Sequence, residues 1–273
     1  MECCYLHGND CAYTVGLHLG GTIEEFAKMM NKKAKEIGAL NTNFTNPHGL
    51  DDGDNYSTAK DMALITRYAL RNKYIDEAVR TKSTTINFGS FSKLLTNTNA
   101  LLRTYPNADG GKTGFTNGAN RCLIASATVN NSRYITVVLG AETTEKRFGE
   151  ARQILEESFK RYIKMDVSNY LNFYIKIPVY KGNIDYYERQ ISDTLSLPLT
   201  QEEYDGVYVK QDIISNITPP MNVGAKIGDI KVYIGDEVIY EKEVFLEENI
   251  YKKGVMDYIK DGIQNMFNER TRF

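Results

Sequence analysis

The sequence predicts an α/β unit over residues 1–164, a small all-β domain over residues 165–250 and an amphipathic C-terminal helix over residues 251–273. Three observations support this fold class. Helical patterns and a hairpin signal occur in the first 164 residues, the hydrophobic period changes to 2 from about Met165, and the tail carries an apolar stripe at helical spacing. A chain of 273 residues exceeds the usual single-domain length, so two domains and an appendage fit it.

Composition excludes several classes of protein. Apolar residues make up 42% and charged residues 25% of the chain, which is typical of soluble globular proteins and not of disordered or collagen-like ones. No window of about 18 apolar residues suggests a transmembrane helix. The net charge is −2 and no basic stripe with interleaved aromatic residues occurs, so we expect no nucleic-acid partner.

Cysteine and histidine spacing indicates neither a disulfide framework nor a metal site. The residues concerned are Cys3, Cys4, Cys11, Cys122, His7, His18 and His48. Three of the cysteines crowd into the first eleven residues, and neither paired C-x-x-C spacing nor an H-E-x-x-H helix is present. We expect the cysteines to be small buried side chains and expect no metal or cofactor. The first ten residues also lack the basic and apolar regions of a signal peptide.

The first helix is predicted over residues 22–38. Thr22 and Glu25 have the spacing of a capping box, and Gly38 suits the left-handed position after the last turn. One face collects the apolar side chains, which we expect to be core: Phe26, Met29, Met30 and Ile37.

A long irregular loop and a second helix follow. Residues 41–57 are rich in Asn, Asp, Gly and Pro, which build turns through their own backbone preferences. Thr58 and Asp61 form a weaker capping box for a helix near residues 57–72. Its inward side chains are predicted to be Met62, Ile65 and Ala69.

A β-hairpin and a third helix close the first unit. After a polar, strand-prone interval, two β-rich runs flank Asn130-Asn131, and Asn tolerates the positive φ of a tight turn. Lys112-Thr113-Gly114 stands at the entrance of this hairpin. Residues 143–163 then show an approximate 3.6 period, carried by Phe148, Ile154, Leu155 and Phe159.

The second half of the chain reads as strands. Short alternating runs separated by Gly, Pro, Asn and Asp predict the all-β domain, and no clustered His, Cys or paired carboxylates mark a site in it. In the tail, the apolar stripe consists of Val255, Tyr258, Ile259, Ile263, Met266 and Phe267. Two roles remain open for residues 255–273, namely docking on protein or peripheral contact with a membrane.

Lys112-Thr113-Gly114 can serve an anionic ligand. The ammonium supplies charge, the hydroxyl donates a hydrogen bond, and glycine lets a ligand approach the backbone. The triplet alone is a weak signal, because an exposed lysine followed by a strand threonine and a bulge glycine is a common structural arrangement. K-T-G is, however, also the third of three elements of penicillin-binding proteins and class A β-lactamases.

Long flanking segments extend the match beyond the triplet. "DGGKTGFTNGANRCLIASA", "VVLGAETTEKRFGEARQILEESF" and the upstream "NTNFTNPHGLDDGDNYSTAKDMALITRYAL" closely resemble the serine-type D-alanyl-D-alanine carboxypeptidases, the low-molecular-mass penicillin-binding proteins of peptidase family S11. The resemblance runs from about Leu6 to Phe159. Ile177 to Gly254 looks like the β-rich C-terminal domain often attached to that family.

The resemblance implies a fold and an activity. The fold is a penicillin-binding/β-lactamase-like transpeptidase domain, here incomplete at its N-terminus, followed by a small all-β sandwich. The activity is that of a hydrolase of the cell envelope, outside the cytoplasm, which removes the terminal D-Ala of peptidoglycan pentapeptides through an acyl-serine. The implied partners are stem peptides ending in D-Ala-D-Ala, and β-lactams that acylate the same serine.

The resemblance also assigns site residues. Substrate binding, including that of the terminal carboxylate, falls to Lys112, Thr113, Gly114 and Thr116. Asn9, like Lys112, is expected to act in catalysis, because Gly8-Asn9-Asp10 matches the family's S-x-N element. His7 stands where the family has serine, so the hydroxyl that takes part in proton transfer is replaced by an imidazole.

The nucleophile element is not found where the family has it. No S-x-x-K precedes His7, and "SFSK" at Ser90 to Lys93 follows a strand-like run, so we interpret it as a chance match. We therefore expect an N-terminally truncated carboxypeptidase without its own nucleophile and of doubtful activity. The alternatives are a non-catalytic remnant that binds peptidoglycan or a partner, and a remnant that folds poorly because strands that would pair with the hairpin are missing.

Overall fold

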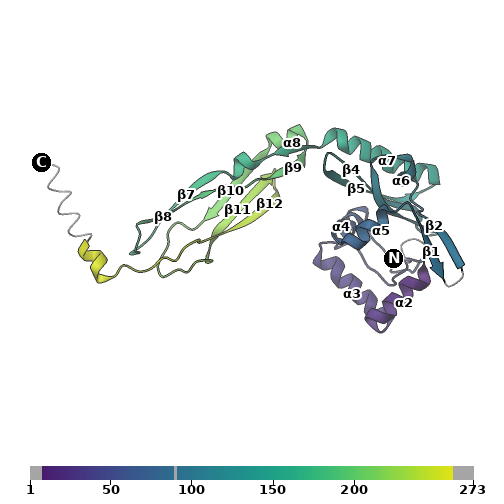
Figure 1. Cartoon of the computed structure of the whole chain (residues 1–273), viewed down its shortest axis with the longest axis horizontal. Helices are drawn as coiled ribbons and strands as arrows, with labels where there is room; N and C mark the ends of the chain where they lie inside the picture. Colours follow the sequence, from purple (N-terminus) through teal and green to yellow (C-terminus); the bar gives the residue numbers. More distant parts are fainter. Residues whose placement is uncertain (1–7, 89–90, 261–273) are drawn as a thin grey trace. The chain divides into compact units, whose positions relative to one another are not determined.

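A computed structural model of the 273-residue chain describes residues 8–88 and 91–260. The chain divides into two compact units, with the boundary between Arg161 and Tyr162, and each unit is described by itself (Figure 1). The expectations placed on His7, on Ser90 and on the tail residues Ile263, Met266 and Phe267 lie outside the described residues.

The first unit contains the helices α2 (Asn9–Gly20), α3 (Ile23–Glu36), α4 (Ala59–Ala69), α5 (Lys73–Arg80), α6 (Leu101–Thr104) and α7 (Thr144–Arg161). The threonine half of each predicted capping box is confirmed, because the Thr22 hydroxyl accepts the Glu25 N–H and the Thr58 hydroxyl accepts the Asp61 N–H. Gly38 takes the predicted left-handed conformation after α3, with φ of 86°.

Five strands complete the first unit. They are β1 (Ser83–Phe88), β2 (Phe91–Thr96), β3 (Ala108–Thr116), β4 (Asn120–Val129) and β5 (Ser132–Ala141). β1 and β2 form an antiparallel hairpin, and the other three form an antiparallel sheet in the order β3-β4-β5. The predicted turn between β4 and β5 is confirmed by positive φ angles of 49° at Asn130 and 62° at Asn131.

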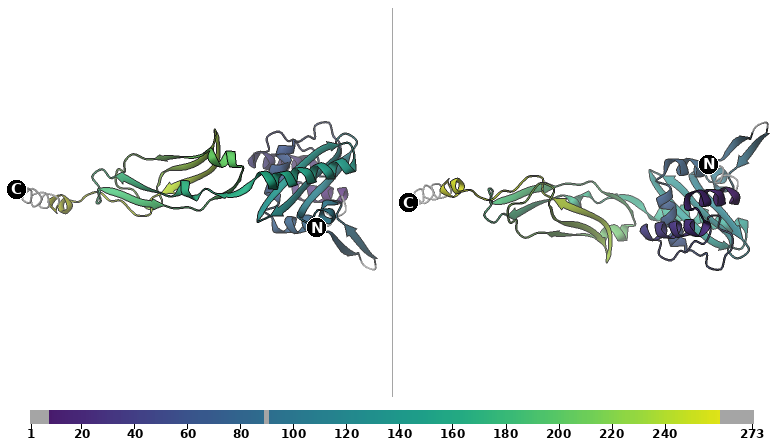
Figure 2. Two further views of the ribbon diagram at one scale, coloured as in Figure 1. Left: turned by 90° about the horizontal axis from the view of Figure 1, so that it is seen from above. Right: turned by 90° about the horizontal axis from the view of Figure 1, so that it is seen from below.

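The core of the first unit lies between the three-stranded sheet and α7, which crosses one face of the sheet (Figure 2). Leu123 and Ala125 of β4 are fully buried beneath Leu155 of α7. Ile154, one of the four residues that carry the predicted helical period, is 45% exposed and lies off the buried face. α7 instead buries Arg147, Ala151 and Leu155, which recur every four residues on the face toward the sheet.

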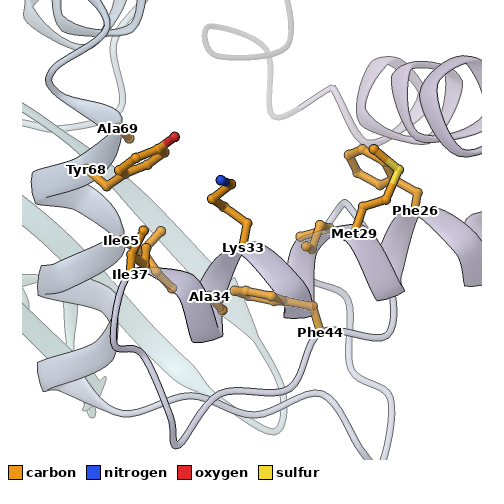
Figure 3. Close-up of a pocket in the computed structure, with 10 residues that line it drawn as sticks. Phe26, Met29, Lys33, Ala34, Ile37, Phe44, Ile65, Tyr68 and Ala69 are labelled. Carbon is orange, nitrogen blue, oxygen red and sulfur yellow. The ribbon is translucent and has the colours of Figure 1, made fainter.

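The apolar stripe of α3 is not the closed core that its spacing predicts. α3 buries Ala27 and Ala34, whereas Met29 is 51% exposed. Large apolar side chains of α3 and α4 instead line a groove of about 380 Å³ (Figure 3). Its lining comprises Phe26, Met29, Met30, Lys33, Ala34, Ile37, Phe44, Ile65, Tyr68 and Ala69. The stripe is apolar on the correct face, but the described residues leave that face open.

The second unit is built from strands, as predicted. It contains β6 (Ile163–Asp166), the 3-10 helix η1 (Ser168–Leu171), β7 (Phe173–Pro178), β8 (Tyr186–Ile191), β9 (Ser196–Leu199), α8 (Gln201–Asp205), β10 (Val207–Ile213), β11 (Lys226–Ile234) and β12 (Glu237–Phe245). The pairings are β6 with β9, β7 with β8, and β10-β11-β12, all antiparallel. Ile217, Ile227 and Ile230 are fully buried in one shared core. None of the helices in residues 8–88 and 91–260 has the length and apolar character needed to cross a bilayer.

Candidate substrate-binding site

The K-T-G triplet lies on β3, at one edge of the three-stranded sheet. Lys112 is opposite Ile124 and Gly114 is opposite Cys122 on β4. Gly111, just before the triplet, has φ of 133°, and a Cβ there would lie 2.0 Å from the Ile124 carbonyl oxygen. Only glycine allows β3 and β4 to approach so closely, so the backbone itself requires the glycine directly before Lys112.

Lys112 and Thr113 point to opposite sides of β3, as successive strand residues do. Lys112 is exposed, and its Nζ donates a hydrogen bond to the Thr113 carbonyl oxygen at 2.6 Å. Thr113 is 5% exposed, and its hydroxyl lies 2.6 Å from the Thr98 hydroxyl. The ammonium is therefore on the accessible side of the strand, whereas the Thr113 hydroxyl is held on the buried side.

Gly114 leaves space beside the strand. The atom nearest to a Cβ built at Gly114 is the Cys122 Cβ at 3.7 Å, which is an ordinary contact distance. The next residue, Phe115, is 57% exposed, and the Arg121 guanidinium lies 5.2 Å from the centre of its ring. A ligand can thus approach Gly114 closely, on the side of β3 that carries Lys112.

Thr116, at the end of β3, is tied to two other segments. Its hydroxyl oxygen accepts the Ala119 N–H at 2.9 Å, and Asp51 from the loop between α3 and α4 accepts the Gly118 N–H at 3.0 Å. The pKa of Asp51 is lowered, first by a hydrogen bond with the Thr116 side chain and second by the Gly118 N–H. Thr116 and Asp51 therefore both hold amides of the turn that follows β3.

An ion network anchors the start of β3. Asp109 accepts hydrogen bonds from Ser126 at 2.7 Å, from Arg133 Nε at 3.0 Å and from Thr128. Arg133 also pairs with Asp76 of α5. These contacts join β3 to β4, β5 and α5 at Asp109, three residues before Lys112. They therefore fix the position of the first residues of the strand that carries the triplet.

Arg147 of α7 lies on the inner side of the triplet. Its NH1 group donates long hydrogen bonds to the Gly114 oxygen at 3.4 Å and the Cys122 oxygen at 3.5 Å. Burial, followed by the nearby Arg121 charge, lowers the pKa of the guanidinium. Within the described residues, Arg147 Nε has no hydrogen-bond partner. Arg147 adds positive charge to the site from the side opposite to solvent.

Asn9, the residue expected from the S-x-N element, is the first residue of α2 and is exposed. α2 packs against α3. The structure thus groups Lys112, Thr113, Gly114 and Thr116 on one strand and places Asn9 on a separate helix.

Serine-lysine pairs at the spacing S-x-x-K occur in two places. Lys93 lies in β2, opposite Ile86, so this match ends in a β-strand and not in a helix, whereas Ser90 lies outside the described residues. Sequence reasoning missed a second match, Ser57-Thr58-Ala59-Lys60, at the start of α4. The Ser57 hydroxyl lies 2.9 Å from the Thr42 hydroxyl, which donates to the buried Asp61 carboxylate at 2.7 Å. Ser57 therefore belongs to a network that fixes the start of α4.

The described thiols and acids form no metal centre. Within residues 8–88 and 91–260, no group of three His, Cys, Asp or Glu side chains is arranged to hold a metal ion. Cys11 and Cys122 are free thiols and are partly exposed, so the expectation of small buried side chains is wrong for these two, whereas Cys3 and Cys4 lie outside the described residues. Cys122 follows the open turn of a hairpin, where few side chains cover it.

Sequence reasoning missed three residues that contact the K-T-G strand, namely Asp51, Thr98 and Arg147. They lie 67, 15 and 33 residues from their partners, and none has the spacing of a local motif. The one available signal was the length of the loop that carries Asp51, since long ordered loops are often functional.

Family models match both units. The model described as "D-alanyl-D-alanine carboxypeptidase" matches residues 4–143. The model described as "Penicillin-binding protein 5, C-terminal domain" matches residues 172–252.

Individual proteins match over most of the chain. D-alanyl-D-alanine carboxypeptidase DacF from Bacillus subtilis is 35% identical over 93% of this chain and 66% of its own length. DacC from Escherichia coli is 29% identical over 96% of this chain and 65% of its own length. The crystal structure of penicillin binding protein 5 from Haemophilus influenzae matches with a TM-score of 0.72 and 28% identity, over 92% of this chain and 73% of that one. The chain spans slightly less than two thirds of the length of the first two relatives.

Proposed function

The chain belongs to the D-alanyl-D-alanine carboxypeptidase family, and from that premise we propose that it acts on peptidoglycan stem peptides ending in D-Ala-D-Ala. The place of action is the cell envelope. The observation that carries the proposal is the position of Lys112, an exposed ammonium on an edge strand beside the open space at Gly114.

The edge of β3 suits an extended peptide. A peptide can add to an exposed strand edge through main-chain hydrogen bonds, and Gly114 lets it lie close to the backbone. Lys112 then leaves the Thr113 carbonyl and pairs with the terminal carboxylate. Arg147 adds a favourable potential from behind the strand.

In the reaction of the family, a serine oxygen attacks the carbonyl of the penultimate D-Ala, the terminal D-Ala leaves as an amine, and water then hydrolyses the acyl-serine. We assign substrate binding to Lys112, Gly114 and Thr116, with Thr113 shaping the strand from its buried side. Asn9 is the residue that matches the family's S-x-N element, next to His7 in place of serine.

Titration calorimetry with the peptide Nα,Nε-diacetyl-L-Lys-D-Ala-D-Ala tests the proposal. We expect Lys112→Ala to weaken binding by about tenfold or more, because a charge-assisted hydrogen bond is lost. Added salt should weaken binding by the wild-type chain. Lys93→Ala, which removes an exposed lysine from β2, is the matched control and should bind like wild type. Equal affinity of wild type and Lys112→Ala would reject the assignment.

Binding without turnover is a second candidate function. It is favoured by the histidine at position 7 and by the two S-x-x-K matches, of which one has its lysine in a β-strand and the other lies in a capping network. Incubation with a labelled penicillin followed by peptide mass mapping separates the two functions. Binding without turnover predicts no covalent adduct, whereas an adduct at Ser57, Ser90 or another serine would identify a nucleophile and favour catalysis.

A further inference from the structure

The end of the K-T-G strand is joined to a loop that is distant in sequence. Asp51 accepts the Gly118 N–H at 3.0 Å, and the Thr116 side chain, before the Gly118 N–H, lowers the pKa of its carboxyl. Thr116 in turn accepts the Ala119 N–H at 2.9 Å. Residues 117–120 are exposed. Asp51 lies outside this hairpin and holds its turn through the Gly118 amide.

The loop that carries Asp51 is itself well fixed. Asn43 and Tyr56 exchange backbone hydrogen bonds of 2.9 and 3.0 Å across the base of the loop. Asn46 accepts the Gly49 N–H at 2.7 Å and donates to the Leu50 oxygen at 3.1 Å, directly before Asp51. Asp51 therefore lies on a loop that is held by its own hydrogen bonds. Its contact with Gly118 can restrain the β3–β4 turn, because the loop itself does not move with the turn.

Gly118 shows how close this approach is. A Cβ at position 118 would lie 3.2 Å from both carboxylate oxygens of Asp51. That distance is tighter than an ordinary contact, so a larger residue would push the carboxylate away. The contact therefore requires both a glycine at position 118 and the carboxylate of Asp51.

We propose that Asp51 is a positioning residue for the substrate-binding strand, which holds Thr116 and the β3–β4 turn in the orientation that binds the peptide. This inference rests on the proposed function. Asp51 acts through Thr116 and the Gly118 amide rather than by touching substrate. Asp51 holds the Gly118 amide, and Thr116 accepts the Ala119 amide of the same turn, so the Asp51 contact keeps the Thr116 side chain in a defined orientation next to the strand edge.

Three variants of the full chain test the proposal. Asp51→Ala removes the contact with the Gly118 N–H. Asp51→Asn keeps an oxygen that can accept the Gly118 N–H, and it is the conservative rescue. Asp52→Ala changes the same charge on the neighbouring exposed residue and is the matched control. Amide hydrogen exchange at Gly118 and Ala119 reports the turn, and calorimetry with Nα,Nε-diacetyl-L-Lys-D-Ala-D-Ala reports recognition.

We expect Asp51→Ala to speed exchange at Gly118 and to weaken peptide binding about fivefold, with Asp51→Asn within about twofold of wild type. Asp52→Ala should match wild type in both measurements. Faster exchange with unchanged peptide affinity would overturn the proposal, as would unchanged exchange. Absence of binding by the wild-type chain would reject the proposed function and with it the role of Asp51 in recognition, while hydrogen exchange would still decide whether Asp51 holds the turn.

Discussion

The hydroxyl groups of Thr98 and Thr113 lie 2.6 Å apart, which joins the segment after β2 to the buried side of the K-T-G strand. Thr113, the middle residue of the triplet, is thereby held on the buried side of β3, while Lys112 remains on the accessible side. The two side chains that family resemblance groups as substrate-binding residues are thus separated by the alternation of the strand.

Thr98→Val should destabilise the chain modestly. The substitution keeps the side-chain shape and removes one hydrogen bond to the nearly buried Thr113 hydroxyl, which costs about 1 kcal/mol. Urea denaturation followed by circular dichroism measures the difference. Thr128→Val, which removes a hydroxyl bound to a carboxylate, should cost more, because hydrogen bonds to charged groups are stronger. No change in Thr98→Val would indicate that the Thr98–Thr113 contact does not stabilise the fold.

Two glycines of β3 should respond differently to alanine. Gly111→Ala places a Cβ 2.0 Å from the Ile124 oxygen at φ of 133°, so we expect a loss of stability of about 3 kcal/mol or more. Gly114→Ala meets its nearest neighbour at 3.7 Å, so we expect it to fold and to bind the D-Ala-D-Ala peptide more weakly. Thermal unfolding and calorimetry distinguish the two effects, and similar thermal stability of the two variants would contradict this account.

The ion network at the start of β3 should make stability depend on pH. Burial raises the pKa of Asp76, but the hydrogen bonds and charges of Arg133 and Arg80 outweigh it, so the folded-state pKa is lowered. A lowered pKa means that the ionised carboxylate stabilises the fold above about pH 4, and that this contribution is lost as the pH falls further. Asp76→Asn should therefore be less stable than wild type at pH 7, and the difference should shrink in acid.

Denaturant titrations at several pH values measure this difference. Glu156→Gln is the matched control, since Glu156 forms an exposed pair with Arg152 within α7 and should contribute little at any pH. A constant gap between wild type and Asp76→Asn from pH 7 into acid would show that the charge of Asp76 is not the stabilising feature.

The groove between α3 and α4 should bind apolar dyes. Met29 is 51% exposed at its edge, so Met29→Glu should lower the fluorescence of bound anilinonaphthalene sulfonate with a change in stability of less than about 0.5 kcal/mol. Ile154→Glu, which also charges a half-exposed apolar position but on α7, serves as the control and should leave the fluorescence unchanged. Equal losses in both variants would place the dye elsewhere.

Local sequence signals predicted the beginnings and ends of several elements. Thr22, Thr58 and Gly38 act through their own backbone neighbours, and Asn130-Asn131 supplies the positive φ angles of its turn. Such contacts span three or four residues, so the sequence pattern contains them. The fold class followed from the same signals together with the change of hydrophobic period near residue 165.

Features set by distant partners could not be predicted. Helix α5 was missed, and its Asp76 is bound by Arg133, which lies 57 residues away. The helical period of the sequence identified the apolar face of α3. Whether other segments cover that face depends on how the chain folds around it, which the period does not contain. In the site, the K-T-G strand was located from the sequence, whereas its supports Asp51, Thr98 and Arg147 become visible only when the strands and loops are assembled.

The central claim is that the exposed edge of β3 binds a peptide ending in D-Ala-D-Ala. Nitrogen-15 NMR of the wild-type chain with that peptide, and with its L-Ala-L-Ala diastereomer at the same concentration, tests the claim most directly. We predict amide shift changes centred on residues 110–116 for the D,D peptide and much smaller ones for the L,L peptide. Equal changes for both peptides, or changes confined to residues outside β3, would contradict it.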